Sequence, residues 1–108
     1  MKESKNLECK ETIQSNTFLK TVSAFANYGT GRIVFGIDDD GQVKGIKNTI
    51  DDCLSIENKM NDNMNPVPVY DLNINVIQQL LLLFMKVTSN LIYIKEKHIK
   101  DTIHQLLK

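Results

Sequence analysis

Among the basic side chains in the first half of the chain, five could contact the phosphates of a nucleic acid. Arg32 begins an apolar segment, and Lys44 and Lys47 follow it closely, so we expect these three to share a small basic patch. An ordinary solvated surface contains the same residue types and is the alternative interpretation. The candidate phosphate contacts are Lys10, Lys20, Arg32, Lys44 and Lys47.

The segment Gly29-Thr30-Gly31 could present backbone N–H groups to a phosphate, such as that of ATP. It lacks the lysine and the spacing of a P-loop, and it follows a predicted helix and precedes a predicted strand, which is the reverse of that motif. A turn that ends the helix explains the two glycines better. Tyr28 could stack on a base, although a tyrosine beside a turn more often packs half-buried.

Residues 23–41 contain the elements that must position these groups. Apolar residues recur at helical spacing and predict a helix that ends near Asn27. Arg32–Ile37 is β-branched, aromatic and apolar on both faces at its centre, which predicts a central strand covered on both sides. Asp38–Gly41 supplies turn chemistry before a short return strand over Gln42–Ile46.

The remaining predicted elements surround this hairpin. Asn6–Lys10 is expected to be the first strand, and Ser15 or Asn16 should cap the first helix. A second helix is expected over Ile50–Asn63, followed by a half-buried strand over Val69–Asn75. The order βαββαβ, with short connections, predicts an α+β domain in which two helices pack on a small mixed sheet.

The sequence changes character after residue 75, so we predict one domain over residues 1–75 and an atypical tail over residues 76–108. Val76–Met85 is Leu-rich and helical in propensity, and residues 89–108 are rich in Lys and Ile. Codons from an AT-rich set would permit an alternating strand in the neighbouring frame, Asp-Thr-Thr-Ile-Thr-Ile-Thr-Phe-Tyr-Glu. We therefore hypothesise that the reading frame slipped near Asn75, which the gene sequence can test.

Composition restricts the classes of function. Lys plus Arg and Asp plus Glu are equal at 13 each, so any nucleic-acid contact must be local. The two cysteines lack CxxC spacing and no secretory segment begins the chain, which predicts reduced thiols in a cytoplasm. The longest apolar run, Leu80–Met85, is far shorter than the ~20 residues of a membrane span. His98 and His104 have no spaced ligand partners and receive no metal role.

Several motifs, taken in order, resemble the Schlafen-type AlbA-like domain of bacterial regulators and of the Schlafen core. The resemblance covers roughly residues 1–75, and Cys9 stands where that family usually has an aromatic residue. It implies a DNA- or RNA-binding domain, the N-terminal piece of a transcriptional regulator or a related bacterial protein. The motifs are Glu3-Ser-x-x-Leu7-Glu8-x-Lys10, Lys20–Asn27, Gly29-Thr-Gly31, Ile33–Asp38, Asp40-Gly41 and Val43-x-Gly45-Ile46.

The resemblance also implies a catalytic site. In the Schlafen core, two glutamates five positions apart and an aspartate after the Phe-x-Gly-Ile strand form a metal-dependent ribonuclease centre. Glu3 and Glu8 keep that spacing, and Asp38, or Asp39 or Asp40, takes the place of the aspartate. Glu3, Glu8 and Asp38 would then be both catalytic residues and ligands of Mg²⁺ or Mn²⁺, which prefer oxygen donors and activate water. Acidic residues in such segments are more often solvated surface.

Three hypotheses of function follow. The main one is a nucleic-acid-binding domain that is not an enzyme and needs no cofactor. The second is a metal-dependent endoribonuclease that uses Mg²⁺ or Mn²⁺. The third is a truncated or vestigial interaction module whose sheet edge pairs with another chain, including a second copy of this one. Salt-dependent retention on nucleic acid separates the third hypothesis from the other two.

Overall fold

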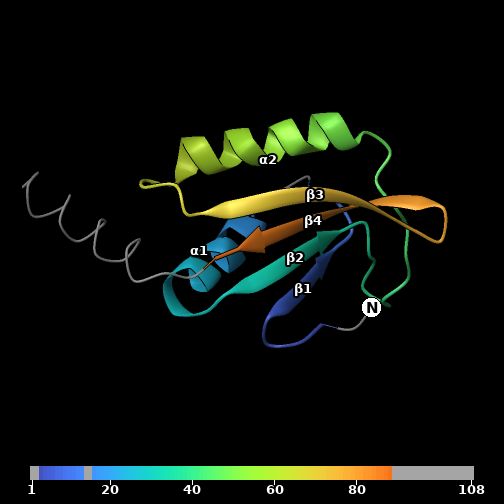
Figure 1. Ribbon diagram of the computed structural model, residues 1–108, viewed down its shortest axis with the longest axis horizontal. Coiled ribbons are helices and arrows are strands. Elements are labelled where there is room, and N and C mark those ends of the chain that lie inside the picture. The colour runs from blue at the N-terminus through green and yellow to red at the C-terminus, as the bar shows by residue number, and fades with distance from the viewer. Residues whose placement is uncertain (1–2, 14–15, 89–108) are drawn as a thin grey trace, which may run out of the picture.

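A four-stranded mixed sheet with two helices makes up the described part of the chain, residues 3–13 and 16–88 of a computed structural model (Figure 1). The strand order is β1-β2-β4-β3, in which β1 and β2 are parallel and the other neighbours are antiparallel. This confirms the α+β class with a mixed sheet. The elements are β1 (Leu7–Lys10), α1 (Phe18–Tyr28), β2 (Gly31–Phe35), α2 (Thr49–Asn63), β3 (Tyr70–Ile77) and β4 (Leu80–Val87).

Strand β2 is the covered central strand that the sequence predicted. Ile33, Val34 and Phe35 are all completely buried. Because successive side chains of a strand point to opposite faces, Ile33 and Phe35 meet the helices, whereas Val34 meets a small apolar cluster with Ile37 and Leu82. The ring of Phe35 also meets that of Phe18 edge to face, with centroids 5.7 Å apart.

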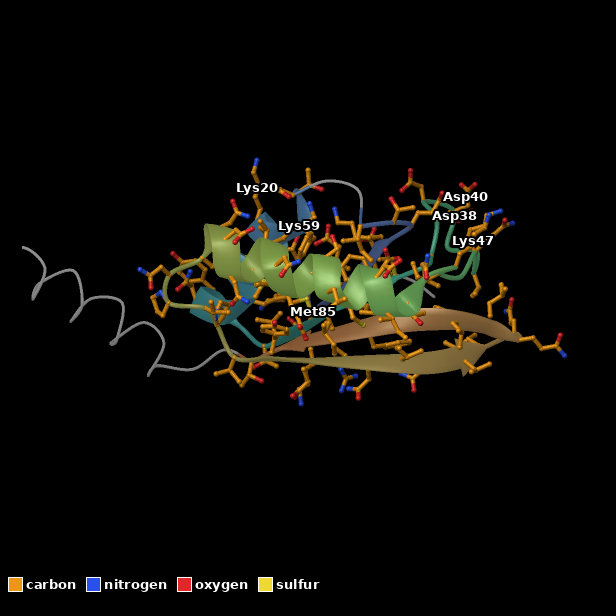
Figure 2. All side chains as sticks on the ribbon, turned by 90° about the horizontal axis from the view of Figure 1, so that it is seen from above. Lys20, Asp38, Asp40, Lys47, Lys59 and Met85 are labelled. Carbon is orange, nitrogen blue, oxygen red and sulfur yellow. The ribbon has the colours of Figure 1, made fainter. Side chains whose placement is uncertain are left out.

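Both helices pack on the same face of the sheet. The buried positions of α1 recur every three to four residues, and α2 buries Ile56 and Met60. Figure 2 shows Met85 of β4 between α2 and the sheet. Thr17, not Ser15 or Asn16, precedes α1 as its N-cap. Neither helix within the described ranges combines the length and apolar character that crossing a membrane requires.

The predicted return strand over Gln42–Ile46 does not form. Among the described residues, this segment makes one isolated bridge, between Ile37 and Val43, and β4 takes the place beside β2. The cause lies at Gly36, whose φ of 110° turns the chain out of the sheet directly after Phe35. The observed order is therefore β-α-β-α-β-β, with the last pair of strands forming the hairpin.

The helical character predicted for Val76–Met85 is wrong, because this segment forms the end of β3 and most of β4. Leu82, Leu83 and Met85 are completely buried, so burial in the sheet overrides the helical propensity of leucine. Strand β3 also runs across the domain boundary predicted at residue 75, and that boundary and the slipped frame stay predictions. His98 and His104 lie outside the described residues.

The turn between β3 and β4 leads to a prediction about stability. Gln78 and Gln79 have φ values of 53° and 64°, as a two-residue type I′ hairpin turn requires. Positive φ is unfavourable for glutamine, whereas asparagine and glycine adopt it readily. Replacing the pair by Asn-Gly should stabilise the fold by about 1 kcal/mol and raise the melting temperature by roughly 4–8 °C. A calorimetric scan that shows an equal or lower melting temperature would contradict this turn geometry.

Candidate nucleic-acid interface

One face of the sheet has no helix packed against it among the described residues. We call it the open face and define it by side chains of β2, β3 and β4 that alternate away from the helices. Across the strands, Arg32 lies opposite Lys86, and Phe84 lies between Val34 and Asn73. The open face includes Arg32, Val34, Asp71, Asn73, Asn75, Phe84 and Lys86, and by the same alternation Ile77, Leu80 and Leu82.

Two cations of the open face are direct neighbours across an antiparallel pair of strands. Arg32 and Lys86 are both exposed, and like charges placed opposite each other destabilise such a pair. Asp71 is the register partner of Lys86 on its other side, yet no ion pair or side-chain hydrogen bond joins Arg32 or Lys86 to another described residue. An anion bound between the two cations would relieve their repulsion.

These cations border a shallow hollow of about 340 Å³ on the open face. Phe84 is half-buried because its ring packs on the apolar cluster that contains Val34, and the residue also lines the hollow. Asn73 and Asn75 add two side-chain amides, each of which can donate and accept hydrogen bonds. The hollow thus combines groups suited to phosphate, to an aromatic base and to a base edge.

The other predicted basic residues lie elsewhere. Lys44 and Lys47 line a separate hollow of about 500 Å³, which they share with Glu11 and Asp52. They do not form the expected common patch with Arg32, because their segment pairs with residues 36–38, beyond the end of β2, whereas Arg32 lies at its start. Acidic residues accompany this second pair of lysines, so the surface there carries less net positive charge.

Lys10 and Lys20 lie near the N-terminal glutamates. Lys10 forms an ion pair with Glu8 at 3.3 Å, and Lys20 lines a hollow of about 360 Å³ with Glu3 and Glu8. Of the basic residues selected from the sequence, Arg32 is therefore the one on the open face. Lys86 was missed because it follows a segment interpreted as helical. Its flanking residues, Met85 and Val87, give a short period-two signal that could have indicated a strand.

The structure brings Glu3 and Glu8 to one hollow, and both carboxylates already have partners there. The Oε2 atom of Glu3 accepts a hydrogen bond of 3.0 Å from the backbone N–H of Cys9. Glu8 accepts a hydrogen bond from the hydroxyl of Thr21, in addition to its ion pair with Lys10. The bond from Thr21 joins β1 to α1, and the bond to Cys9 ties Glu3 to β1, so both glutamates have structural contacts.

Asp38 lies apart from the two glutamates. Figure 2 shows it at one end of the molecule, well separated from Lys20, which borders the glutamate hollow. Within residues 3–13 and 16–88, no three His, Cys, Asp or Glu side chains are close enough together to hold a metal ion. The described donors therefore do not fit a three-carboxylate centre for Mg²⁺ or Mn²⁺, and Asp39 and Asp40 are exposed turn residues.

Asp38 instead fixes its own turn. Its Oδ1 atom accepts hydrogen bonds of 2.9 Å from the backbone N–H groups of Asp40 and Gln42, and Oδ2 lies 3.7 Å from the Nζ atom of Lys44. The side chain is 12% exposed, so these bonds are partly shielded from water. The aspartate that the family resemblance marked as catalytic thus has a clear structural function here.

We expect Asp38→Ala to lower the free energy of unfolding by about 2 kcal/mol, because two backbone donors lose a charged acceptor. Asp38→Asn keeps an oxygen at the Oδ1 position and should cost less than about 1 kcal/mol. Urea denaturation measures both changes. Asp39→Ala, at an exposed neighbouring position, is the matched control and should stay within about 0.5 kcal/mol of the wild type. Equal losses for Asp38→Ala and Asp39→Ala would contradict the assigned role.

The segment Gly29-Thr30-Gly31 ends α1 and leads into β2. The backbone N–H of Gly29 bonds to the carbonyl oxygen of Phe25 at 3.2 Å. A Cβ atom on Gly31 would lie 2.4 Å from the ring of Phe25, so glycine is required there for packing. Tyr28 is 90% exposed, which differs from the half-buried packing expected beside this turn.

Neither described cysteine is set up as a nucleophile. Burial and the nearby carboxylate of Glu3 raise the pKa of the Cys9 thiol, and burial and Glu57 raise that of Cys53. A raised pKa keeps each thiol protonated at neutral pH, and the thiolate is the reactive form. Cys9 packs on the apolar cluster of Val34, which explains how it can occupy a position that is usually aromatic.

Comparison with known proteins supports the resemblance seen in the motifs. No curated protein and no solved structure gives a significant match. A family model described as Schlafen, AlbA_2 matches residues 3–105, which includes every strand and helix described above. Since this match spans nearly the whole sequence, the chain belongs to the Schlafen, AlbA_2 family.

Proposed function

We propose that this chain is a cytoplasmic nucleic-acid-binding domain that serves a transcriptional regulator or a related bacterial protein. Membership of the family indicates a function related to nucleic acid at a coarse level. The observation that carries the proposal is the pair Arg32 and Lys86, two exposed cations that face each other without an anionic contact among the described residues. Phosphate groups of DNA or RNA are the anions that would bind between these two cations.

A salt titration of binding tests the proposal. The affinity of the chain for fluorescein-labelled oligonucleotides is measured by anisotropy between about 50 and 200 mM salt. Two phosphate contacts correspond to a slope of log K against log salt of about −1.4 for a single strand and about −1.8 for a duplex. We expect a slope at least this steep, which for the single strand means roughly a sevenfold loss of affinity over that range.

The double variant Arg32→Gln/Lys86→Gln should reduce the slope by the same amount, since it removes both contacts. Lys44→Gln/Lys47→Gln removes an equal charge from the other hollow and is the matched control. Its slope should stay close to that of the wild type. An affinity that does not depend on salt, or no binding at about 50 mM salt, would refute the proposal.

The alternative of a metal-dependent endoribonuclease would have to use Glu3 and Glu8, which share a hollow with Lys20, without Asp38 as a third carboxylate. It predicts cleavage of structured RNA that requires Mn²⁺ or Mg²⁺ and is lost in Glu8→Gln. The glutamine keeps an oxygen that can accept the hydrogen bond from Thr21, so the fold is retained. If the wild-type chain leaves RNA intact in the presence of Mn²⁺, the nuclease is excluded. Normal oligonucleotide binding by Glu8→Gln would then leave the binding function in place.

The alternative of an interaction module has one observation in its favour. Strand β3 forms an edge of the described sheet, and its Ile74 and Val76 are 44% and 66% exposed. An exposed apolar edge can pair with a strand of a second copy. This alternative predicts a dimer in light scattering that Val76→Lys dissociates, and a monomer at every concentration tested would contradict it.

A further inference from the structure

We propose that the open face binds single-stranded nucleic acid by stacking one unpaired base on Phe84 while Arg32 and Lys86 hold the adjacent phosphate. This inference deepens the proposed function and rests on it. It specifies the form of nucleic acid and the side chain that distinguishes a single strand from a duplex. The open face would recognise the features that RNA and DNA share, an aromatic base and a charged backbone.

The environment of Phe84 suits the stacking of a base. Its ring packs against the buried cluster of Val34 and Leu82, so it is held in place rather than free in solvent. The ring is nevertheless only half-buried, and its neighbour on the outer strand, Asn73, is itself exposed. An aromatic ring that is held in place and only partly buried is suited to base stacking.

The two cations lie close to this ring on the same face. Arg32 and Lys86 occupy the row of the sheet adjacent to the row of Val34, Phe84 and Asn73. Adjacent rows on one face are two residues apart, which is about 7 Å along the strand. A nucleotide whose base covers Phe84 can therefore place a phosphate at the Arg32–Lys86 pair.

Two amide side chains lie on the same face. The side chains of Asn73 and Asn75 line the hollow and make no hydrogen bond with another described residue. They can form hydrogen bonds with the donors and acceptors on the edge of an unpaired base. In a duplex, base pairing already uses these groups. The face therefore favours one strand over two.

A substitution series at Phe84 tests the inference on the full chain. The probes are labelled twelve-residue oligo(dT) and oligo(U) and a DNA duplex of equal length. Phe84→Leu keeps an apolar side chain over Val34 but removes the ring, and it should weaken single-strand binding by roughly 5- to 100-fold. Its salt slope should stay unchanged because both cations remain. Leu54→Ala removes an exposed apolar side chain from α2, on the opposite side of the sheet, and should bind as the wild type does.

A second variant provides a direct signature of stacking. The chain contains no tryptophan, so Phe84→Trp introduces a single fluorophore on the open face. We expect Phe84→Trp to bind the single strand at least as tightly as the wild type and to lose fluorescence when oligo(dT) or oligo(U) is added. The duplex should quench it far less. Thermal melts of each variant confirm that the fold is intact.

The outcomes separate this inference from the function on which it rests. If the wild-type chain binds none of the probes, the proposed function fails and the inference fails with it. If the wild type binds with the expected salt slope but prefers the duplex, or if Phe84→Leu binds oligo(dT) and oligo(U) normally, the inference alone is overturned. Quenching by either single strand supports it, and the comparison of oligo(dT) with oligo(U) shows whether the sugar is also read.

Discussion

Phe35→Ala is expected to lower the free energy of unfolding by about 4 kcal/mol, the largest effect of any substitution considered for this chain. Phe35 is completely buried in β2, between β1 and β4, and its ring contacts that of Phe18 at a centroid distance of 5.7 Å. Truncation leaves a cavity that the surrounding sheet and helix cannot close. Because domains of this size are stable by only about 5–15 kcal/mol, the loss should be plain in guanidinium denaturation.

The matched control for Phe35→Ala is Tyr28→Ala, which removes an aromatic ring of similar size that is 90% exposed. Its effect should remain within about 0.5 kcal/mol. A loss below about 1 kcal/mol for Phe35→Ala would mean that β2 is not the centre of the core.

Charge reversal at the open face should produce the second large effect. In Arg32→Glu/Lys86→Glu, two side chains that attract phosphate become two that repel it. Each lost contact is expected to cost at least about tenfold in affinity, so oligonucleotide binding should fall by roughly 100-fold or more at low salt. Since both side chains are exposed, the melting temperature should change little. Fluorescence anisotropy at about 50 mM salt measures the loss.

The same reversal at Lys44 and Lys47 distinguishes the two hollows. The sequence alone placed these lysines beside Arg32, whereas the structure gives them a separate hollow with Glu11 and Asp52. Lys44→Glu/Lys47→Glu should therefore reduce affinity only through its general change in net charge, well below 100-fold. If this control weakens binding as much as the open-face variant does, the interface has been assigned to the wrong surface.

The sequence predicted those elements whose local residue pattern matches their burial in the fold. The run of β-branched and aromatic residues at 33–37, with turn residues after it, predicted a covered strand, and Ile33 and Phe35 are indeed buried. The apolar spacing of α1 was equally clear because its buried positions follow the helical period. The start of the first helix was less clear, since its N-cap is Thr17 and makes no side-chain capping bond.

The hairpin of β3 and β4 could not be predicted for two physical reasons. Its turn consists of Gln78 and Gln79, which lack the Asn-Gly chemistry that normally signals a type I′ turn. Strand β4 is buried on both faces over Leu82 and Leu83, so its sequence shows a continuous apolar run instead of alternation. Such a run is compatible with either a helix or a strand, and only pairing with β2 decides between them.

The candidate site was predictable only in part for the same reasons. Arg32 could be selected because it begins a strand that the sequence shows clearly. Lys86 and Phe84 belong to β4, so their place opposite Arg32 and Val34 follows from the pairing of strands that are far apart in sequence. The spacing of Glu3 and Glu8 was informative about proximity, but Asp38 leaves the sheet after Gly36 and does not join them.

The most direct test of this account is to map backbone amide chemical shifts while the labelled chain is titrated with oligo(dT). The account predicts that the largest changes fall on Arg32, residues 73–75 and residues 84–86, at the open face. Changes concentrated on Lys44, Lys47 and the start of α2, or around Glu3 and Glu8, would contradict it.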